Sequence, residues 1–340
     1  MKRTFLLCFI LLGWLHSAFG QATFNIDGFS EQYYGKVYFS DTTQTASAGW
    51  VEVYDRATKK KLIHVDADEL SFDFYDNPQK AYITKIPYEE QSAILYKDFN
   101  FDGVKDFAII DGFRNWTLGH SFKIFLASSK RFVFSDSFTE LTQDNQGMFT
   151  VNAINKTIST KSKIGDTWYQ YSDYIVENNK PKLIRRHTDD YEHAPFYRET
   201  IEELKGNKMV KTTRSSLALE RYHIEECFKF HVDKVNKDII LCNFYDDRLY
   251  YVILDAKQNV EFYYPFEELR QTSDFIFYRK NGKLTFKNKD ASYTIYDKSG
   301  NIGVDITYKG KTHRWKGNAK SRRGSIGKLL KGSLDNVVYQ

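Results

Sequence analysis

The strongest sequence evidence for the fold lies in the stretch Asp98-Phe-Asn-Phe-Asp-Gly-Val-Lys-Asp106 and in the apolar run Phe107-Ala-Ile-Ile110 that follows it. Four apolar residues beside a glycine-containing turn are too few for a helix and are typical of a buried strand. The polar stretch before them therefore reads as a loop that opens this strand. The segment as a whole predicts β structure.

Short runs that alternate between apolar and polar residues lie on both sides of this segment. Polar turns separate them at intervals of about ten residues, which is the pattern of an antiparallel all-β domain. The predicted strands include residues 37–39, 50–54, 61–65, 107–110, 122–126, 131–134, 149–151, 156–160 and 168–176. The turn Asn178-Asn179-Lys180-Pro181 follows, and Leu183-Ile184 begins the last strand of the series.

The length of 340 residues exceeds what one hydrophobic core usually serves, so we expect two domains. The composition changes over residues 187–200, where histidines and a proline lie among charged residues. We therefore expect a first β domain at 21–190 and a C-terminal β-rich domain of unknown role at 191–340. The predicted fold class is mainly β, with two antiparallel β-rich domains.

The second domain is expected to contain one or two short helices, near Glu199–Lys205 and Leu217–Phe230. Strands resume from Ile239. Residues 274–286 predict a hairpin, in which Asn281-Gly282 supplies the positive φ values of a two-residue turn. Residues 293–308 predict a second hairpin.

The N-terminus carries the features of a secretory signal peptide. Lys2 and Arg3 precede the apolar run Phe5–Leu15, and Ala18-Phe-Gly20 supplies small residues before a cut. The apolar run is shorter than the roughly 20 residues that a membrane-spanning helix needs. We expect cleavage after Gly20, a periplasmic or secreted mature chain, and no transmembrane segment in it.

The charge balance argues against nucleic acid as a partner. The 49 Lys and Arg residues stand against 44 Asp and Glu residues. Loss of Lys2 and Arg3 with the leader brings the net charge to about +3, which is close to neutral for a chain of this size.

The loop quoted above has the oxygen donors that a hard divalent cation prefers. Its spacing, Asp-x-Asn-x-Asp-Gly-x-x-Asp, places side-chain oxygens at alternate positions of a tight turn that Gly103 permits. This pattern predicts a Ca²⁺ site. The predicted ligands are the side chains of Asp98, Asn100, Asp102 and Asp106 and the carbonyl of Val104.

The loop departs from a complete EF-hand at its twelfth position, where Ile109 replaces the bidentate glutamate. Weaker binding follows, and we expect a Kd of about 10⁻⁴–10⁻³ M, as in extracellular modules. Such a site suits a structural role and not a sensor. The alternative is an acidic turn that never holds an ion.

Two cysteines remain after the leader, Cys227 and Cys242. An even number in an oxidising compartment predicts one disulfide between them. The alternative is a pair of buried free thiols.

The sequence contains no Gly-x-Ser-x-Gly elbow, phosphate-binding loop or dinucleotide fingerprint. His187 and His193 lie among acidic residues, but their spacing is not that of a zinc site. The basic segment 316–331 reads either as a solvated edge or as a surface for lipid phosphates or an acidic partner.

Several elements of the first half carry a family resemblance, namely residues 98–109, 121–126, 131–132, 149–151, 174–176 and 178–181. On these elements, residues 25–190 resemble a family of bacterial periplasmic β proteins that carry an EF-hand-like calcium loop. One branch of this family inhibits lysozymes and lysozyme-like peptidoglycan hydrolases. Ile164-Gly-Asp-Thr-Trp168 stands where some relatives have a Ser-Gly-Cys-Cys segment, so that feature is absent here.

Three hypotheses follow for the function. The resemblance implies an exported, calcium-binding, non-enzymatic envelope protein that inhibits a peptidoglycan hydrolase. The second is a surface or secreted module that binds envelope glycan through exposed Trp and Tyr side chains. The third is a hydrolase whose site a single sequence does not reveal.

Overall fold

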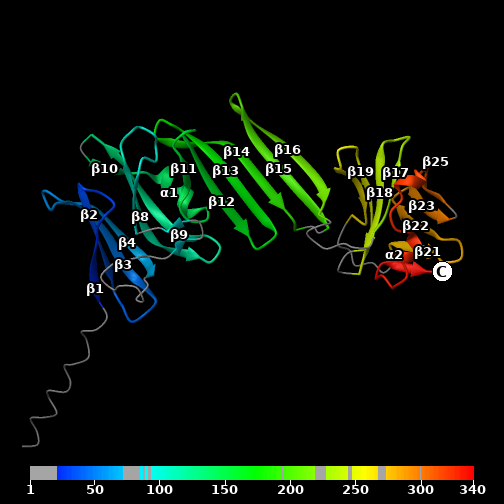
Figure 1. The fold of residues 1–340 in the computed structure, drawn as a ribbon, viewed down its shortest axis with the longest axis horizontal. Coiled ribbons are helices and arrows are strands. Elements are labelled where there is room, and N and C mark those ends of the chain that lie inside the picture. Colours follow the sequence, from blue (N-terminus) through cyan, green and yellow to red (C-terminus); the bar gives the residue numbers. More distant parts are fainter. Residues whose placement is uncertain are drawn as a thin grey trace, which may run out of the picture. The chain divides into compact units, whose positions relative to one another are not determined.

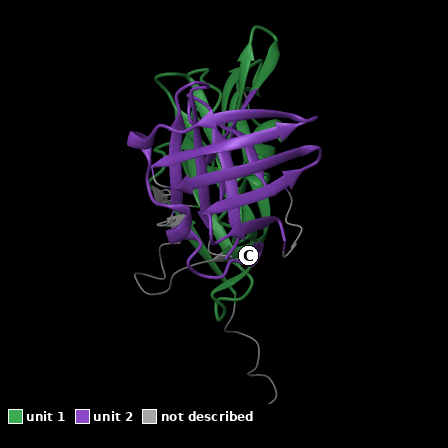
Figure 2. Cartoon of the chain, turned by 90° about the vertical axis from the view of Figure 1, so that its right-hand side faces the viewer, with its two compact units in different colours: residues 1–188, 201–211 green, residues 189–200, 212–340 purple. Residues whose placement is uncertain are grey.

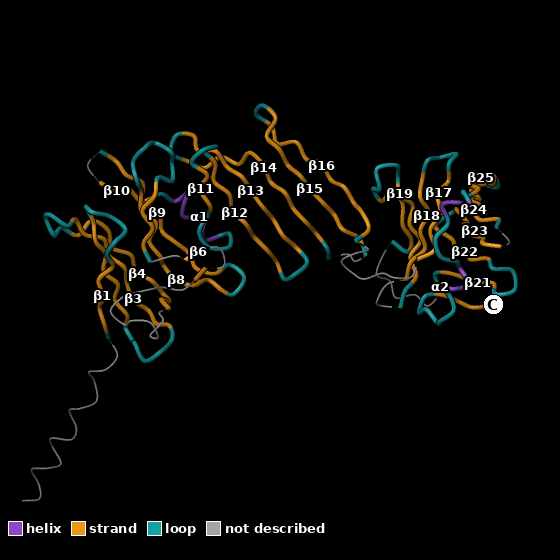
Figure 3. Tube along the Cα trace, in the orientation of Figure 1, coloured by secondary structure: helices purple, strands orange, loops and turns teal. Residues whose placement is uncertain are grey.

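The computed structural model describes residues 21–71, 93–129, 131–192, 195–218, 227–243, 247–266, 273–298 and 300–340, and the backbone of the short strand pair at 85–86 and 89–90. The chain is mainly β, as predicted, and its strands form several antiparallel sheets (Figures 1 and 3). The predicted leader lies outside the described residues. Within them, no helix has the length and apolar character needed to cross a bilayer.

The first sheet follows chain order and is antiparallel throughout. Its inward residues, among them Val37, Val51 and Val65, are buried, whereas the residues between them face outward. This alternation arises because successive side chains of a strand point to opposite faces. The strands are β1 (Ala22–Ile26), β2 (Tyr33–Phe39), β3 (Ala46–Asp55) and β4 (Lys61–Ser71).

The second sheet carries the predicted calcium loop and has the order β10-β9-β8-β7. The apolar run Phe107–Ile110 is fully buried in β8, as its composition predicts. The hydroxyls of Thr139 and Thr142 on α1 (Asp136–Gln143) accept hydrogen bonds from backbone N–H groups of β9. The strands are β7 (Ile94–Lys97), β8 (Asp106–Asn115), β9 (Gly119–Ser128) and β10 (Arg131–Phe134). A separate pair joins β5 (Lys85–Ile86) to β6 (Glu89–Glu90).

A six-stranded sheet in chain order follows, and Figure 1 shows its strands side by side. None of the described residues of its last three strands is buried, and in the strand before them the buried residue is Ser172. Both faces of this part of the sheet therefore meet water. The strands are β11 (Thr150–Asn152), β12 (Thr157–Ile164), β13 (Trp168–Glu177), β14 (Lys180–Asp190), β15 (Phe196–Lys205) and β16 (Lys208–Leu217).

The C-terminal part contains two sheets whose buried faces share one hydrophobic core. The four-stranded sheet comprises β17 (Cys227–Val232), β18 (Lys237–Asn243), β19 (Leu249–Leu254) and β20 (Val260–Tyr264). The other has the order β25-β24-β23-β22-β21-β26, in which β26 pairs parallel to β21. It comprises β21 (Phe275–Tyr278), β22 (Lys283–Asn288), β23 (Ala291–Lys298), β24 (Asn301–Tyr308), β25 (Lys311–Lys316) and β26 (Val337–Tyr339), with η1 (Ala319–Ser321) and α2 (Ile326–Leu329) before the last strand.

The chain divides into two compact units near the predicted boundary (Figure 2). One comprises residues 1–188 and 201–211, and the other comprises residues 189–200 and 212–340. The β15–β16 hairpin thus contributes residues to both units, which a single cut after residue 190 does not describe.

Two local predictions are wrong. Glu199–Lys205 is strand and not helix. The prediction failed because both faces of β15 meet water, so its sequence lacks the apolar–polar alternation that marks a strand. The hairpin of β21 and β22 exists, but Tyr278 pairs with Lys283, which leaves a four-residue loop in which Gly282 alone has a positive φ. A helix was also predicted at 217–230. Leu217 is the last residue of β16 and residues 227–230 lie in β17, whereas residues 219–226 lie outside the described part of the chain.

Candidate metal centre

The predicted calcium loop joins β7 to β8, and its ends meet where Lys97 pairs with Asp106. Two residues take positive φ angles, Phe101 at 63° and Gly103 at 90°. A Cβ on Gly103 would meet nothing, so its glycine is required by the backbone conformation and not by space. The turn is therefore as tight as the spacing of the acidic residues predicts.

The side chains at the first three predicted positions bind backbone N–H groups of the loop itself. Asp98 accepts hydrogen bonds from the N–H of Asp102 at 3.2 Å and of Gly103 at 2.9 Å. Asp102 accepts one from the N–H of Val104 at 2.8 Å. These bonds tie the carboxylates of Asp98 and Asp102 to the backbone of the turn.

Asp106 differs from the others because it is fully buried. Its two carboxylate oxygens accept hydrogen bonds from the N–H of Phe99 at 2.8 Å and of Ala127 at 2.7 Å. Burial raises the pKa of Asp106 to about 6, and the nearby charges of Asp102 and Asp98 add to this effect. Asp106 thus links the loop to β9 and carries a buried carboxyl group that lies near the charges of Asp98 and Asp102.

Asn100 connects the loop to a segment that the sequence pattern did not implicate. Its side-chain amide donates to Asp102 at 2.9 Å and to the Oδ1 of Asn179 at 3.0 Å. Asn179 lies in the turn between β13 and β14, where it and Asn178 both have positive φ. Only the tertiary structure identifies this partner, since 79 residues separate the two.

The donor set fits a hard divalent cation in its chemistry, with three carboxylates and a carboxamide in one loop. Within the described residues, however, no group of three or more His, Cys, Asp or Glu side chains converges closely enough to hold an ion. Asp98 and Asp102 instead bind loop N–H groups, and Asp106 binds Phe99 and Ala127. Calcium binding therefore stays a prediction.

An aromatic cluster supports the loop from the core side. Tyr96 stacks on Phe107 with ring centroids 4.6 Å apart, and Tyr33 lies 5.4 Å from Phe107. Phe29 adds a further edge contact to Phe107 at 6.0 Å. The strands that flank the loop are thus fixed by ring packing as well as by backbone hydrogen bonds.

The two cysteines lie directly opposite each other, Cys227 on β17 and Cys242 on β18. Lys229, two residues along β17, exchanges both backbone hydrogen bonds with Arg323 on the outer side of the strand. Since residues two apart direct their backbone groups to the same side, Cys227 and Cys242 form a non-hydrogen-bonded pair, with Cα atoms about 4.5 Å apart.

That separation lies within the range of disulfide bonds. Both thiols are nevertheless free in the structure, so the predicted disulfide stays a prediction. The hydrogen bond between the two thiols lowers the pKa of Cys227 and raises that of the fully buried Cys242. Cys227 is therefore the more readily ionised member of the pair.

The remaining predicted candidates do not assemble into a site. His187 lies on β14, and His193 lies outside the described residues. In the basic segment, Arg322 forms an ion pair of 2.9 Å with the buried carboxylate of Asp297. Part of that basic charge is thus used within the fold.

Sequence reasoning missed a buried carboxylate on the outer face of the first sheet. Glu52 is 5% exposed, and its Oε1 lies 2.7 Å from Nζ of Lys61 and 2.8 Å from Nδ1 of His64. Burial acts to raise the pKa of Glu52, but hydrogen bonds from Lys61, Tyr54 and His64 outweigh it and hold the pKa below its usual value. The hydrogen bond between the Tyr54 hydroxyl and Glu52 raises the pKa of Tyr54 to about 12. Its position between the inward Val51 and Val53 is the sequence signal that places it outside.

Fold and site together define an antiparallel β protein with an oxygen-rich loop at the start of a buried strand. No family model matches the sequence, and no curated protein matches it. A Xanthomonas type IV secretion system related protein is similar in structure, with 20% identity, a TM-score of 0.44, and coverage of 55% of this chain and 92% of that one.

Two further solved structures match over more of the chain but less well. A putative 6-phosphogluconolactonase from Bacteroides uniformis has 8% identity and a TM-score of 0.21, with coverage of 86% of this chain and 83% of that one. TolB from Acinetobacter baumannii has 8% identity and a TM-score of 0.21, with coverage of 86% and 65%. All these TM-scores are too low to carry an argument about function.

Proposed function

We propose that this chain is an exported, non-enzymatic binding protein of the bacterial envelope and that Ca²⁺ in the Asp98–Asp106 loop stabilises it. One observation supports this most directly: the buried carboxylate of Asp106 joins the loop to β9 and lies near the charges of Asp98 and Asp102. A cation would relieve this repulsion. Because the loop also contacts the β13–β14 turn through Asn100, its stability would extend to two sheets.

The partner that we propose is a lysozyme-like peptidoglycan hydrolase. The resemblance of residues 25–190 to the periplasmic calcium-loop family supports this choice. The sequence also lacks the common catalytic motifs, which favours a binding protein over an enzyme.

The exposed side chains of unit 1 favour glycan recognition as a second candidate. Trp116, in the β8–β9 loop, is 94% exposed, although the loop backbone is fixed. The side-chain amide of Gln146 donates a hydrogen bond to the carbonyl of Thr117 at 2.7 Å, and the backbone N–H of Gln146 donates one to the carbonyl of Lys161 on β12. An uncovered indole on a hydrogen-bonded loop is a typical anchor for a ligand or partner.

A turbidity assay of peptidoglycan lysis separates the hypotheses. Slower lysis by added lysozyme in the presence of the purified protein is expected for an inhibitor. Lysis by the protein alone would contradict the proposal and favour a hydrolase. Retention on a glycan column without any effect on lysis would favour the second candidate.

Trp116→Ala tests the second candidate further. Ile154→Ala is the matched control, since Ile154 has the same exposed fraction and lies on another turn. Glycan retention that falls in the first variant and not in the second assigns the contact to the indole.

A further inference from the structure

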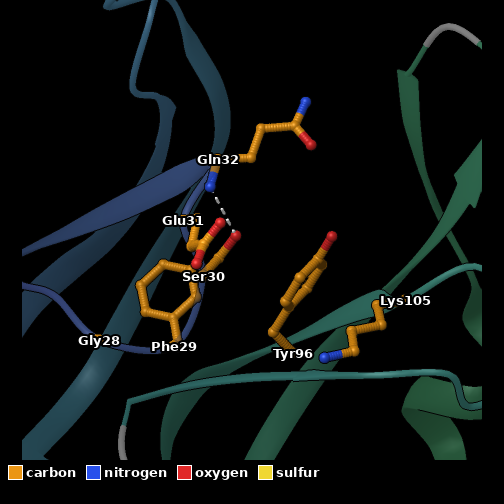
Figure 4. A pocket seen from close by; sticks show the side chains of 7 residues that line it. All are labelled: Gly28, Phe29, Ser30, Glu31, Gln32, Tyr96 and Lys105. Atoms are coloured by element: carbon orange, nitrogen blue, oxygen red, sulfur yellow. Dashed lines mark hydrogen bonds between the residues drawn. The ribbon is translucent and has the colours of Figure 1, made fainter.

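A pocket of about 500 Å³ lies beside the calcium loop, and its size is within the range of small-molecule sites. One side is formed by the loop between β1 and β2, residues Gly28–Gln32. The other side is formed by Tyr96 on β7 and by Lys105 in the Asp98–Asp106 loop (Figure 4).

The walls of the pocket are held by contacts behind them. Phe29 and Tyr96 both pack on Phe107, with ring centroids 6.0 and 4.6 Å away. The hydroxyl of Ser30 accepts hydrogen bonds from the N–H of Gln32 at 3.1 Å and of Tyr33 at 3.2 Å, which closes the β1–β2 loop. The pocket is therefore formed before any ligand binds.

Opposite charges lie on the two sides. Glu31 comes from the β1–β2 loop, and Lys105 has its ammonium 5.4 Å from the ring centroid of Tyr96. In the described part of the chain neither side chain has an ion-pair partner. A purely anionic ligand would meet the carboxylate, and a purely cationic one would meet the ammonium.

We propose that this pocket binds a short peptide zwitterion. The ammonium end of the ligand pairs with Glu31, the carboxylate end pairs with Lys105, and its small apolar part packs on Phe29 and Tyr96. The rings provide an apolar surface between the two charged ends. This assignment does not depend on the proposed calcium site, because the pocket residues carry both charges.

Calorimetric titration of the full mature chain with L-alanyl-L-alanine tests the proposal, with saturating calcium and with chelator. We expect saturable binding that weakens at least about fivefold with N-acetyl-L-alanyl-L-alanine or with L-alanyl-L-alaninamide, since each lacks one charged end. D-Alanyl-D-alanine identifies the source, because tighter binding of this isomer indicates a cell-wall peptide and tighter binding of the L-isomer a protein fragment.

Variants assign the contacts. Glu31→Gln and Lys105→Gln should each weaken binding about fivefold, whereas the exposed controls Glu69→Gln and Lys60→Gln should not. The double exchange Glu31→Lys with Lys105→Glu should restore binding. The proposal is overturned if the dipeptide does not bind at millimolar concentration, if both blocked dipeptides bind equally well, or if the controls weaken binding as much. A chain that binds the dipeptide but whose melting temperature does not change with calcium would leave this pocket assigned and overturn the metal proposal alone.

Discussion

The side-chain amide of Asn100 donates a hydrogen bond of 3.0 Å to the side-chain oxygen of Asn179, which joins the Asp98–Asp106 loop to the β13–β14 turn. Asn179→Gly removes this acceptor but keeps a residue that tolerates the positive φ of 58°. We expect a loss of about 1 kcal/mol in the free energy of unfolding, measured by urea titration. Asn178→Gly, at the neighbouring position with φ of 51°, is the control. Equal losses in the two variants would show that the bond does not contribute.

Calcium should stabilise the chain through the acidic loop. At about 1 mM Ca²⁺ and a Kd of about 10⁻⁴ M, linkage predicts about 1.4 kcal/mol, which calorimetry detects as a higher melting temperature. The double variant Asp98→Asn with Asp102→Asn should lose this response, and the exposed control Asp68→Asn should keep it. An unchanged response in the double variant would remove the loop as the binding site.

Stability without metal should depend on pH through Asp106. Its folded pKa, about 6, lies above the value near 3.9 of an unfolded aspartate, so the protonated form favours the folded state. This contribution is fully present below about pH 4 and is lost as the pH rises through about 6, with a magnitude on the order of 3 kcal/mol.

Asp106→Asn should abolish that part of the pH dependence, which urea titrations in chelator between pH 4 and pH 7 would measure. The same slope in both proteins would contradict it. Because calcium needs the ionised carboxylate, its stabilising effect should also grow over this pH interval.

The cysteine pair should oxidise without rearrangement of the sheet. Exchange with oxidised glutathione would form the Cys227–Cys242 bond, break the glutathione disulfide and transfer the two thiol hydrogens to give two molecules of reduced glutathione. Closure of this loop should stabilise the folded chain by about 3 kcal/mol. Mass spectrometry and the melting temperature of the oxidised and reduced forms measure both effects. Cys242→Ser is the control, since it should yield only a glutathione adduct at Cys227. Two free thiols after prolonged exchange would refute the disulfide.

The strands that pack on a core could be predicted from sequence because burial imposes a period of two on their side chains. Val51, Glu52 and Val53 illustrate this, since their alternation fixes which face each residue occupies. The strand Phe107–Ile110 was recognisable for another reason, as an apolar run beside a glycine turn. In contrast, β15 was predicted in part as helix because neither of its faces is buried.

The site was predictable only where it is local in sequence. The spacing from Asp98 to Asp106 identifies the loop, but it does not reveal that Asp106 binds Ala127 or that Asn100 binds Asn179. The pocket requires Glu31 and Lys105 to lie on opposite walls that come from two different sheets, and no sequence pattern encodes that arrangement.

The wet faces of β14, β15 and β16 have a thermodynamic consequence. Because these strands bury no side chain fully, separating them would expose little apolar surface, and the heat-capacity change of that step should be small. Their cohesion instead comes from backbone hydrogen bonds and from ion pairs such as Arg186–Glu202 at 3.1 Å. Amide protons of these three strands should therefore exchange with solvent deuterium well before those of β8, through local opening that leaves both cores intact.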